Sequence, residues 1–413
     1  MIGGDLIALS SLRAGDVGRA LGVVVQRHVA IELMRRAITI AENQWPEMAE
    51  AHMEVPLEYF VNEEFAAKER TLFETSPLAL VASSEIANPH DFIVRNAVGR
   101  SVLITRDEDG VAHAFLNYCR HRGAEPAQGC GNARRFSCPY HAWVYDTKGQ
   151  LVGMPLRDRH DGFDLSRYGL VELPSEERHG FVWVVLQRDH PIDVAAHLGE
   201  LDGEIGDLGC DKMTYYSSLA EAPISANWKS VAEGLLEGLH VPFVHADTFN
   251  LNPQAANVDL AFIDAIGPHV RWGLPMFGQD EAARLRATPE SEWRPEESIG
   301  CIWLISPGLL LANELYGLIY ADLTPGYGLA ESYFRYGWLS PVKEPPEGMP
   351  APDEMAARAA KAVGQDQLVW EGCGRGLSRG AHGYELIGPN EKAVQLFHQL
   401  LARQTGYSGL RYV

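Results

Sequence analysis

The stretch Cys119-Arg-His121, followed after sixteen residues by Cys138-Pro-Tyr-His141, carries the strongest signal in the chain. Each pair mixes a cysteine with a histidine, whereas common zinc sites place two cysteines before two histidines. A cluster of two irons uses that mixture, because two thiolates bind one iron and two imidazoles bind the other. The pattern therefore indicates an iron–sulfur centre, with a structural zinc site as the alternative.

A second group of candidate ligands follows about a hundred residues later. In the segment from Asn227 to His245, the histidines His240 and His245 are five residues apart, and Pro242 between them interrupts regular helical geometry. Two imidazoles near a helix end can converge on one metal. An open iron site adds one carboxylate and leaves positions for dioxygen and substrate. Spacing alone does not identify that carboxylate.

The two Cys–His loops resemble those of the Rieske domain in bacterial ring-hydroxylating oxygenases. Ala124 and Tyr140 stand where Rieske proteins of respiratory complexes have disulfide cysteines, which favours the oxygenase type. The resemblance spans about residues 55 to 405. It implies a [2Fe–2S] cluster bound by four side chains: Cys119, His121, Cys138 and His141. Cys130 has no partner in the pattern and is expected to be a structural thiol.

The resemblance extends to the second group. Asp366, five residues before Glu371, is similar in position to the family's third iron ligand, which implies a mononuclear iron held by His240, His245 and Asp366. Glu237 stands where the family has a carboxylate that bridges His141 of one subunit and His240 of its neighbour. Three positions depart from the family pattern, Gly234 for a common Asn, Leu239 for Tyr and Gly374 for Gln. The first two imply a less polar pocket.

The pattern along the chain predicts an α+β fold. Short β-type runs separated by turns predict a small all-β domain, as at Ser101–Thr105, Ala112–Leu116 and Gly180–Leu186. Strand-like runs farther on include Gly300–Ile305, Leu309–Ile319 and Ser332–Leu339, and residues 353–377 and 390–405 have helical patterns, the second with Asn390 as N-cap. By resemblance, these are a Rieske β-sandwich and a helix-grip (START-like) domain.

Three parts are expected along the chain. Residues 1–54 form an N-terminal helical segment that packs on the catalytic part, residues 55–190 the Rieske domain and residues 191–413 the catalytic domain with its mononuclear iron. Within the first part, residues 17–42 space their apolar positions as an amphipathic helix does.

The composition excludes several classes of partner. A net charge of −20 disfavours nucleic acid and anionic membranes, because both repel it. Six cysteines spread over 413 residues do not resemble a secreted disulfide scaffold, so we expect reduced thiols or metal ligands in a cytoplasmic protein. No apolar stretch is long enough to predict a membrane span.

The resemblance implies the function of a terminal oxygenase component. It would use dioxygen and electrons from a separate reductase, through a ferredoxin in some systems, to hydroxylate an aromatic or polycyclic substrate. NAD(P)H would act only indirectly, since the chain has no Gly-rich dinucleotide fingerprint. A homotrimer or a multiple of it is expected. The alternatives are an O- or N-demethylating monooxygenase, including the quaternary-amine type, an electron-transfer protein without catalytic iron, and a ligand-binding module with zinc in the loops.

Overall fold

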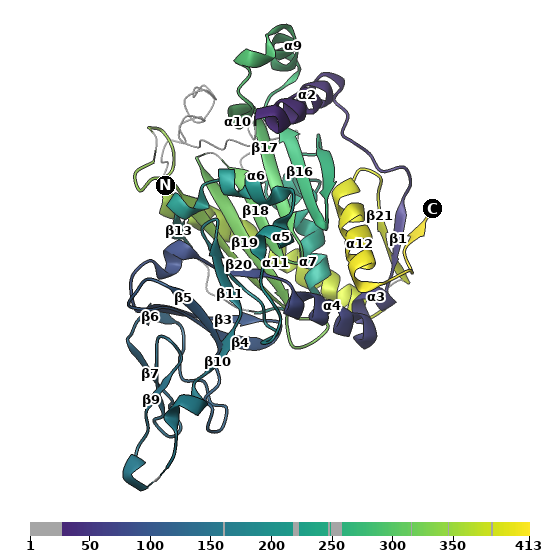
Figure 1. Ribbon diagram of the computed structural model, residues 1–413. Helices are drawn as coiled ribbons and strands as arrows, with labels where there is room; N and C mark the ends of the chain where they lie inside the picture. The colour runs from purple at the N-terminus through teal and green to yellow at the C-terminus, as the bar shows by residue number, and fades with distance from the viewer. Residues whose placement is uncertain are drawn as a thin grey trace, which may run out of the picture.

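The computed structural model describes residues 27–159, 162–217, 223–246, 248, 258–314, 316–345, 347–380 and 383–413. The first ten residues of the predicted 17–42 helix lie outside these ranges. Figure 1 shows two parts, a β domain at the lower end and a larger domain of helices and sheet above it. Within the described ranges, no helix combines the length and apolarity that a membrane crossing requires.

The lower domain consists of short antiparallel strands in three small sheets. One sheet has the order β10-β5-β4-β3-β6, the second β11-β12-β2 and the third β7-β8-β9. Val98 and Gly99, both at positive φ (51° and 69°), join β3 to β4 in the two-residue turn that suits the twist of a hairpin. The strands are β2 (Leu78–Ala82), β3 (Asp91–Ala97), β4 (Arg100–Arg106), β5 (Ala112–Leu116), β6 (Cys130–Asn132), β7 (Arg135–Ser137), β8 (Val144–Asp146), β9 (Leu151–Gly153), β10 (Val171–Leu173), β11 (Ser175–Arg178) and β12 (Phe181–Val184).

The upper domain is built on an antiparallel sheet with the order β13-β20-β19-β18-β17-β16-β15, and β14 also pairs with β20. The helices α7 (Trp228–Leu235), α11 (Pro352–Ser378) and α12 (Lys392–Thr405) pack on this sheet. Helices packed on an antiparallel sheet confirm the predicted α+β class. The strands of this sheet are β13 (Thr214–Tyr216), β14 (Pro223–Ile224), β15 (Phe262–Ile266), β16 (His269–Pro275), β17 (Ile299–Ile305), β18 (Leu309–Glu314), β19 (Gly317–Pro325) and β20 (Ser332–Ser340).

Two details of the upper domain correct the sequence predictions. The run Leu309–Ile319 is not one strand, because Glu314 pairs with Gly317 in a hairpin between β18 and β19. Apolar residues on both sides of that turn concealed it. Helix α12 begins at Lys392, and its N-cap is Glu391, not Asn390. The Glu391 carboxylate accepts the Gly388 N–H at 2.6 Å instead of capping the helix.

The N-terminal part packs on the upper domain. Helix α2 (Arg27–Asn43) lies against β16 and α9 (Gln279–Ala287), and Arg36 pairs with Glu47 and Asp264 at 2.8 and 2.6 Å. Farther along, β1 (Met53–Pro56) pairs with two strands from the other end of the chain, β21 (Tyr384–Ile387) and β22 (Arg411–Tyr412), while α3 (Glu58–Val61) and α4 (Glu63–Thr75) lie against α11 and α12. We therefore propose that the Rieske domain begins near residue 76 and not at residue 55.

A buried polar group ties α4 to α7. Lys229 is 1% exposed, and its ammonium donates to Glu69 Oε1 at 2.6 Å. The indole N–H of Trp228 donates to the other carboxylate oxygen at 2.8 Å. The full pairing of these buried charges matters, because removing one partner of such a pair destabilises by about 3–5 kcal/mol. The contacts of Glu69 with Lys229 and Trp228 fix α7, the helix that precedes the candidate metal ligands His240 and His245.

We predict that the upper domain loses stability below pH 6.5 through His197 on α5 (Val194–Leu198). Burial, helped by His269 at a ring distance of 5.4 Å, lowers the pKa of His197 to about 4. The unfolded chain takes up a proton near pH 6.5, whereas the folded chain does so only near pH 4, so stability falls as pH drops through this window. At pH 5 the effect amounts to about 1–2 kcal/mol.

The measurement is the urea midpoint at pH 7 and pH 5. His197→Gln should reduce the difference, with buried His398, whose pKa is also lowered to about 4, supplying a further part, while the exposed His28→Gln should leave it unchanged. An equal pH dependence in wild type and His197→Gln would contradict the prediction.

Candidate metal centres

The two Cys–His loops share one backbone geometry. In each loop, the cysteine N–H donates to the carbonyl five residues ahead, and the cysteine carbonyl accepts from the N–H four residues ahead, with all four bonds at 2.8–2.9 Å. The residue four positions after each cysteine has positive φ, Gly123 at 79° and Ala142 at 52°. Both loops therefore curl in the same way and present Cys119 and Cys138 alike.

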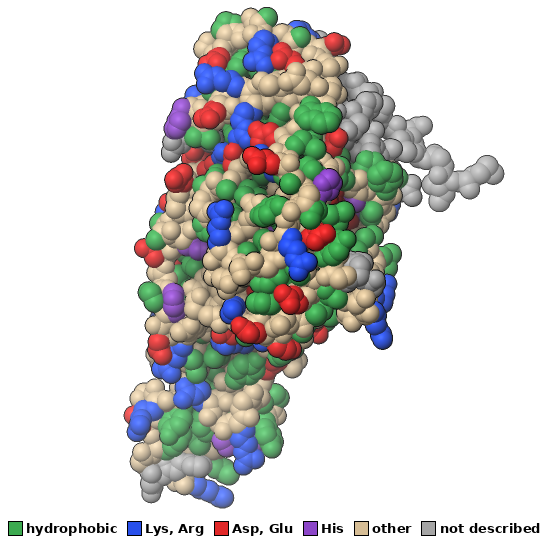
Figure 2. Space-filling model, turned by 90° about the vertical axis from the view of Figure 1, so that its right-hand side faces the viewer, with side chains coloured by type: hydrophobic (Ala, Val, Ile, Leu, Met, Phe, Trp, Pro, Cys, Tyr) green, Lys and Arg blue, Asp and Glu red, His purple; other side chains and the backbone are tan. Residues whose placement is uncertain are grey.

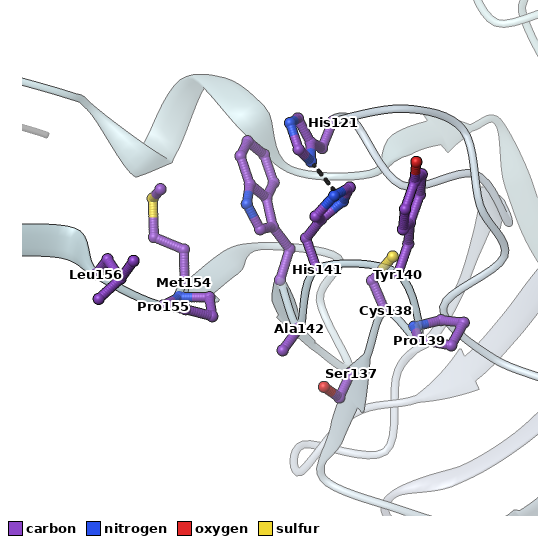
Figure 3. A pocket seen from close by; sticks show the side chains of 11 residues that line it. His121, Ser137, Cys138, Pro139, Tyr140, His141, Ala142, Met154, Pro155 and Leu156 are labelled. Atoms are coloured by element: carbon purple, nitrogen blue, oxygen red, sulfur yellow. Dashed lines mark hydrogen bonds between the residues drawn. The ribbon is translucent and has the colours of Figure 1, made fainter. Parts of the chain in front are cut away.

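The four predicted cluster ligands come together as two pairs of one kind each. The Nδ1 atoms of His121 and His141 are 3.1 Å apart, and a dashed line joins the two rings in Figure 3. The thiols of Cys119 and Cys138 interact with each other and are buried, each residue being 3% exposed. Buried sulfurs on one side and outward imidazoles on the other fit a two-iron cluster with thiolates on one iron and imidazoles on the other. Their role as ligands stays a prediction.

Aromatic side chains support these pairs, and the sequence did not predict them. Tyr145 on β8 donates its hydroxyl to Cys119 Sγ at 3.3 Å and accepts the Arg120 N–H at 3.0 Å. The Trp143 ring stacks on His121 at 5.0 Å. Hydrogen bonds to the sulfurs are one means by which a protein sets the reduction potential of such a cluster. Cys130 lies exposed on β6, outside both pairs.

The imidazole side opens to the surface. A hollow of about 680 Å³ lies there, with His141, Tyr140 and Leu156 among its lining residues. Tyr140 and Leu156 are 57% and 58% exposed, which is high for large apolar side chains. Large exposed apolar side chains around one hollow are typical of interaction sites.

The second candidate centre lies between α7, α8 (Val241–Val244) and α11. His240 and His245 flank the short helix α8, and Asp366 projects from α11. One ligand atom from each residue lies within 4.8 Å of the others. His245 Nε2 is 2.9 Å and His240 Nε2 3.6 Å from Asp366 Oδ1. The three predicted ligands therefore meet at one point, although Asp366 comes from a distant part of the sequence.

The remaining imidazole nitrogens are held by acceptors. Glu237 contacts His240 Nδ1, and its other oxygen accepts the His240 backbone N–H at 3.1 Å. Gln365 Oε1 lies 3.0 Å from His245 Nδ1 and accepts the Thr248 hydroxyl at 2.7 Å. With each Nδ1 engaged in this way, each Nε2 offers its lone pair to a metal. Gln365, adjacent to Asp366, was not predicted, because nothing in its spacing distinguishes it.

Burial and the neighbouring charges shift the pKa values of two of these side chains. Burial raises the pKa of Asp366 to about 6, although His245 and His240 oppose the shift. Burial also acts to lower the pKa of His240, but the hydrogen bond and charge of Glu237 outweigh it and raise that pKa. Two imidazoles and one carboxylate on one face are the donor set of non-haem Fe(II) sites that leave positions open. The side chains thus fit an iron, and their role as its ligands stays a prediction.

Two family models match the chain. The Rieske [2Fe-2S] domain matches residues 76–172, and the ring hydroxylating alpha subunit (catalytic domain) matches residues 207–406. These ranges contain the first and second candidate centres, respectively.

Known proteins are similar over parts of the chain. The carnitine monooxygenase oxygenase subunit of Acinetobacter baumannii is 31% identical over 45% of this chain and 51% of its own length. The naphthalene 1,2-dioxygenase large oxygenase component of a Ralstonia species is 30% identical over 46% of this chain and 45% of its own length. The chain thus spans about half the length of the curated relatives it matches. A solved quaternary ammonium Rieske monooxygenase, 19% identical, shares the fold with a TM-score of 0.70 over 87% of this chain and 96% of that one.

The family resemblance and the predicted fold are therefore confirmed. The match to a catalytic domain disfavours the two non-enzyme alternatives, an electron-transfer protein and a ligand-binding module. The matches to a Rieske [2Fe-2S] domain and to the catalytic domain of a ring hydroxylating alpha subunit, which together span most of the chain, place it in the family of Rieske non-haem iron oxygenase alpha subunits.

Proposed function

We propose that this chain is the terminal oxygenase component of an enzyme that hydroxylates an organic substrate. The observation that carries the proposal is that one chain holds both donor sets, the paired Cys–His loops and the triad of His240, His245 and Asp366. When bound, a [2Fe–2S] cluster supplies single electrons and an iron binds dioxygen beside the substrate.

Glu237 is the proposed bridge between the centres of two subunits. Its Oε1 faces His240 Nδ1, and its Oε2 accepts two backbone N–H groups, from Leu239 and His240. Ionised carboxylates accept about four hydrogen bonds, so Glu237 can also accept the outward N–H of a second subunit's cluster histidine. In this proposal Glu237 orients both imidazoles at once.

The arrangement of the chain supports an assembly of several copies. Figure 1 places β7, which ends directly before Cys138, at the lower end of the molecule, well apart from α7 and α11. Electrons would have to reach the triad from a neighbouring chain. We therefore propose a head-to-tail ring, a homotrimer or a multiple of it, in which the cluster loops of one copy face the triad of the next.

Charge and apolar exposure support this contact. Between residues 119 and 167 there are eight Lys and Arg but five Asp and Glu, in a chain of net charge −20. Figure 2 shows Lys and Arg side chains around this lower end. We call the exposed arginines there the cluster rim: Arg120, Arg122, Arg134, Arg135, Arg157, Arg159 and Arg167. Beside the triad, Phe243 and Leu368 are 84% and 72% exposed, with the acids Glu237 and Glu371 half-buried near them.

Charge reversal in the cluster rim should weaken the assembly. Arg157→Glu with Arg159→Glu replaces two attractions by repulsions, and we expect association at least about tenfold weaker, more so at low salt. Light scattering over a concentration series measures it. Arg284→Glu, an exposed arginine on α9 outside the rim, is the matched control. Unchanged molar mass at all concentrations in the double variant would contradict the proposed contact.

The electron donor is proposed to be a separate reductase, alone or through a ferredoxin, that oxidises NAD(P)H. The cytoplasmic location expected from the cysteine content stays a prediction. The domain limits that we propose are residues 27–75 with 191–413 for the catalytic part and about 76–190 for the Rieske part.

Two substrate classes remain candidates. The leading one is an aromatic or polycyclic compound, supported by the apolar inner face of the sheet, where Phe334, Tyr336 and Trp272 lie in one hydrophobic cluster. The second is an N-methyl or quaternary amine, favoured by the similarity to carnitine monooxygenase and by the same rings, since a cation binds to aromatic faces.

The test is turnover under ¹⁸O-labelled dioxygen with an electron source and a panel of arenes and trimethylammonium compounds. The proposal expects label in an organic product from one of the two classes, and formaldehyde release where an N-methyl group is oxidised. Electron consumption without any labelled product across both classes would contradict it.

A further inference from the structure

Gly234 has no room for a side chain. It lies in the last turn of α7, six residues before His240, and a Cβ placed there would be 2.3 Å from Trp370 Nε1. Non-bonded carbons in proteins pack at about 3.5–4.0 Å, so such an approach is not tolerated. The Trp370 indole thus occupies the space of a side chain at position 234. The place where the family commonly has Asn is filled from the facing helix.

Trp370 and Asp366 lie on the same side of α11. Trp370 follows Asp366 by one helical turn, and residues at that spacing share a face. Helical side chains lean towards the N-terminus and cover the turn before their own Cα. The indole therefore leans back over the turn that holds Asp366.

The indole has one further ring contact, and α11 has a second close approach nearby. Phe334 on β20 meets it edge-to-face at 5.6 Å, and Trp370 is 4% exposed. One turn later on α11, a Cβ at Gly374 would be 3.1 Å from both Ala226 Cα and the Ser225 carbonyl. Gly374, another departure from the family pattern, thus lets α11 approach the start of α7 closely. The two glycines and the tryptophan form one set of contacts between the elements that supply the ligands.

We propose that Trp370, seated on Gly234, is a positioning residue that sets the spacing between α11 and α7, and so between Asp366 and the two histidines. The indole also forms an apolar wall on the Asp366 side of the centre, where an asparagine amide would offer hydrogen bonds. A substrate with an apolar group on that side is favoured, because an unpaired polar group there would lose its hydrogen bonds to water. The inference rests on the proposed function, since the triad is taken to hold iron.

The experiment compares Fe(II) retention in four variants of the full chain. Gly234→Ala places a Cβ against the indole, and Gly364→Ala, on α11 with nothing within 4 Å of its Cβ, is the matched control. Trp370→Leu removes the indole without adding an overlap, and Gly234→Ala/Trp370→Leu removes the overlap itself. Each purified protein is titrated anaerobically with Fe(II) and desalted, and iron per chain is measured. The cluster absorbance of the same sample reports whether the chain is folded.

We expect Gly234→Ala and Trp370→Leu each to retain Fe(II) about 10- to 100-fold more weakly, with unchanged cluster absorbance. Gly364→Ala should match wild type, and the double variant should bind more tightly than Gly234→Ala, because the two changes are coupled through one contact. Wild-type retention in Trp370→Leu would overturn the inference even if Gly234→Ala fails to fold. The inference would also be overturned if the double variant lost as much Fe(II) retention as the losses of the two single variants added together. If wild type itself retains no third iron, both the inference and the proposed function fail.

Discussion

Asp366→Ala is expected to lose the mononuclear iron and to reduce product formation by more than about 100-fold, since even changes outside the ligand set cost about 10- to 100-fold. Asp366 is the sole carboxylate of the triad, and its Oδ1 faces both Nε2 atoms at 2.9 and 3.6 Å. Without it, two neutral imidazoles remain, and they hold Fe(II) poorly. The cluster loops lie in the other domain, so the absorbance of the [2Fe–2S] cluster should not change.

Iron and sulfide per chain, together with product yield, check this expectation. Asp353→Ala removes an exposed carboxylate from the first turn of the same helix and serves as control. Sustained turnover by Asp366→Ala, or loss of the cluster along with the iron, would contradict the assignment of Asp366 as a ligand to a separate centre.

Glu237→Gln is the second change with a large expected effect. The amide keeps the shape of the side chain but offers one acceptor oxygen where the carboxylate has two. The Glu237 carboxylate contacts His240 Nδ1 and two backbone N–H groups. With a single acceptor oxygen, the amide side chain of the variant cannot keep these contacts and also accept from the imidazole of a second subunit. We expect product formation to fall by about 100-fold or more while both metal centres stay loaded, because communication between them is lost.

The measurement is the rate at which the prereduced cluster is reoxidised in the presence of substrate and dioxygen. That rate should fall with turnover in Glu237→Gln. Glu391→Gln changes a neighbouring half-buried carboxylate whose acceptor role is towards Gly388 and should leave the rate near wild type. Cluster reoxidation at the wild-type rate in Glu237→Gln would show that this carboxylate is no bridge.

The candidate site could be predicted where its chemistry is local in sequence. Cys119 and His121, like Cys138 and His141, are close neighbours, so ligand type and spacing identify them without a structure. Asp366 is different, because acidic residues on helices are common and the histidines lie more than a hundred residues away. Only the family resemblance singled it out, and the structure brings it to the histidines. Tyr145 and Gln365 were missed because their partners are defined by tertiary packing alone.

The fold shows the same limit. Strands β4, β5 and β20 follow from their own apolar and β-branched residues. The hairpin hidden in Leu309–Ile319 did not, because apolar runs flank its turn on both sides, although Glu314 and Gly317 mark the turn itself. The later start that we propose for the Rieske domain rests on the pairing of β1 with β21 and β22, more than 300 residues away, and such pairing leaves no mark on the local sequence.

The most direct test of the central claim, that one chain holds two separate iron centres, is a count of metals. Protein purified without oxygen and supplied with Fe(II) would be assayed for iron, zinc and acid-labile sulfide on one sample. We predict about three iron and two sulfide per chain, with no stoichiometric zinc. Zinc without sulfide would contradict the cluster, and two iron with two sulfide after Fe(II) addition would contradict the triad.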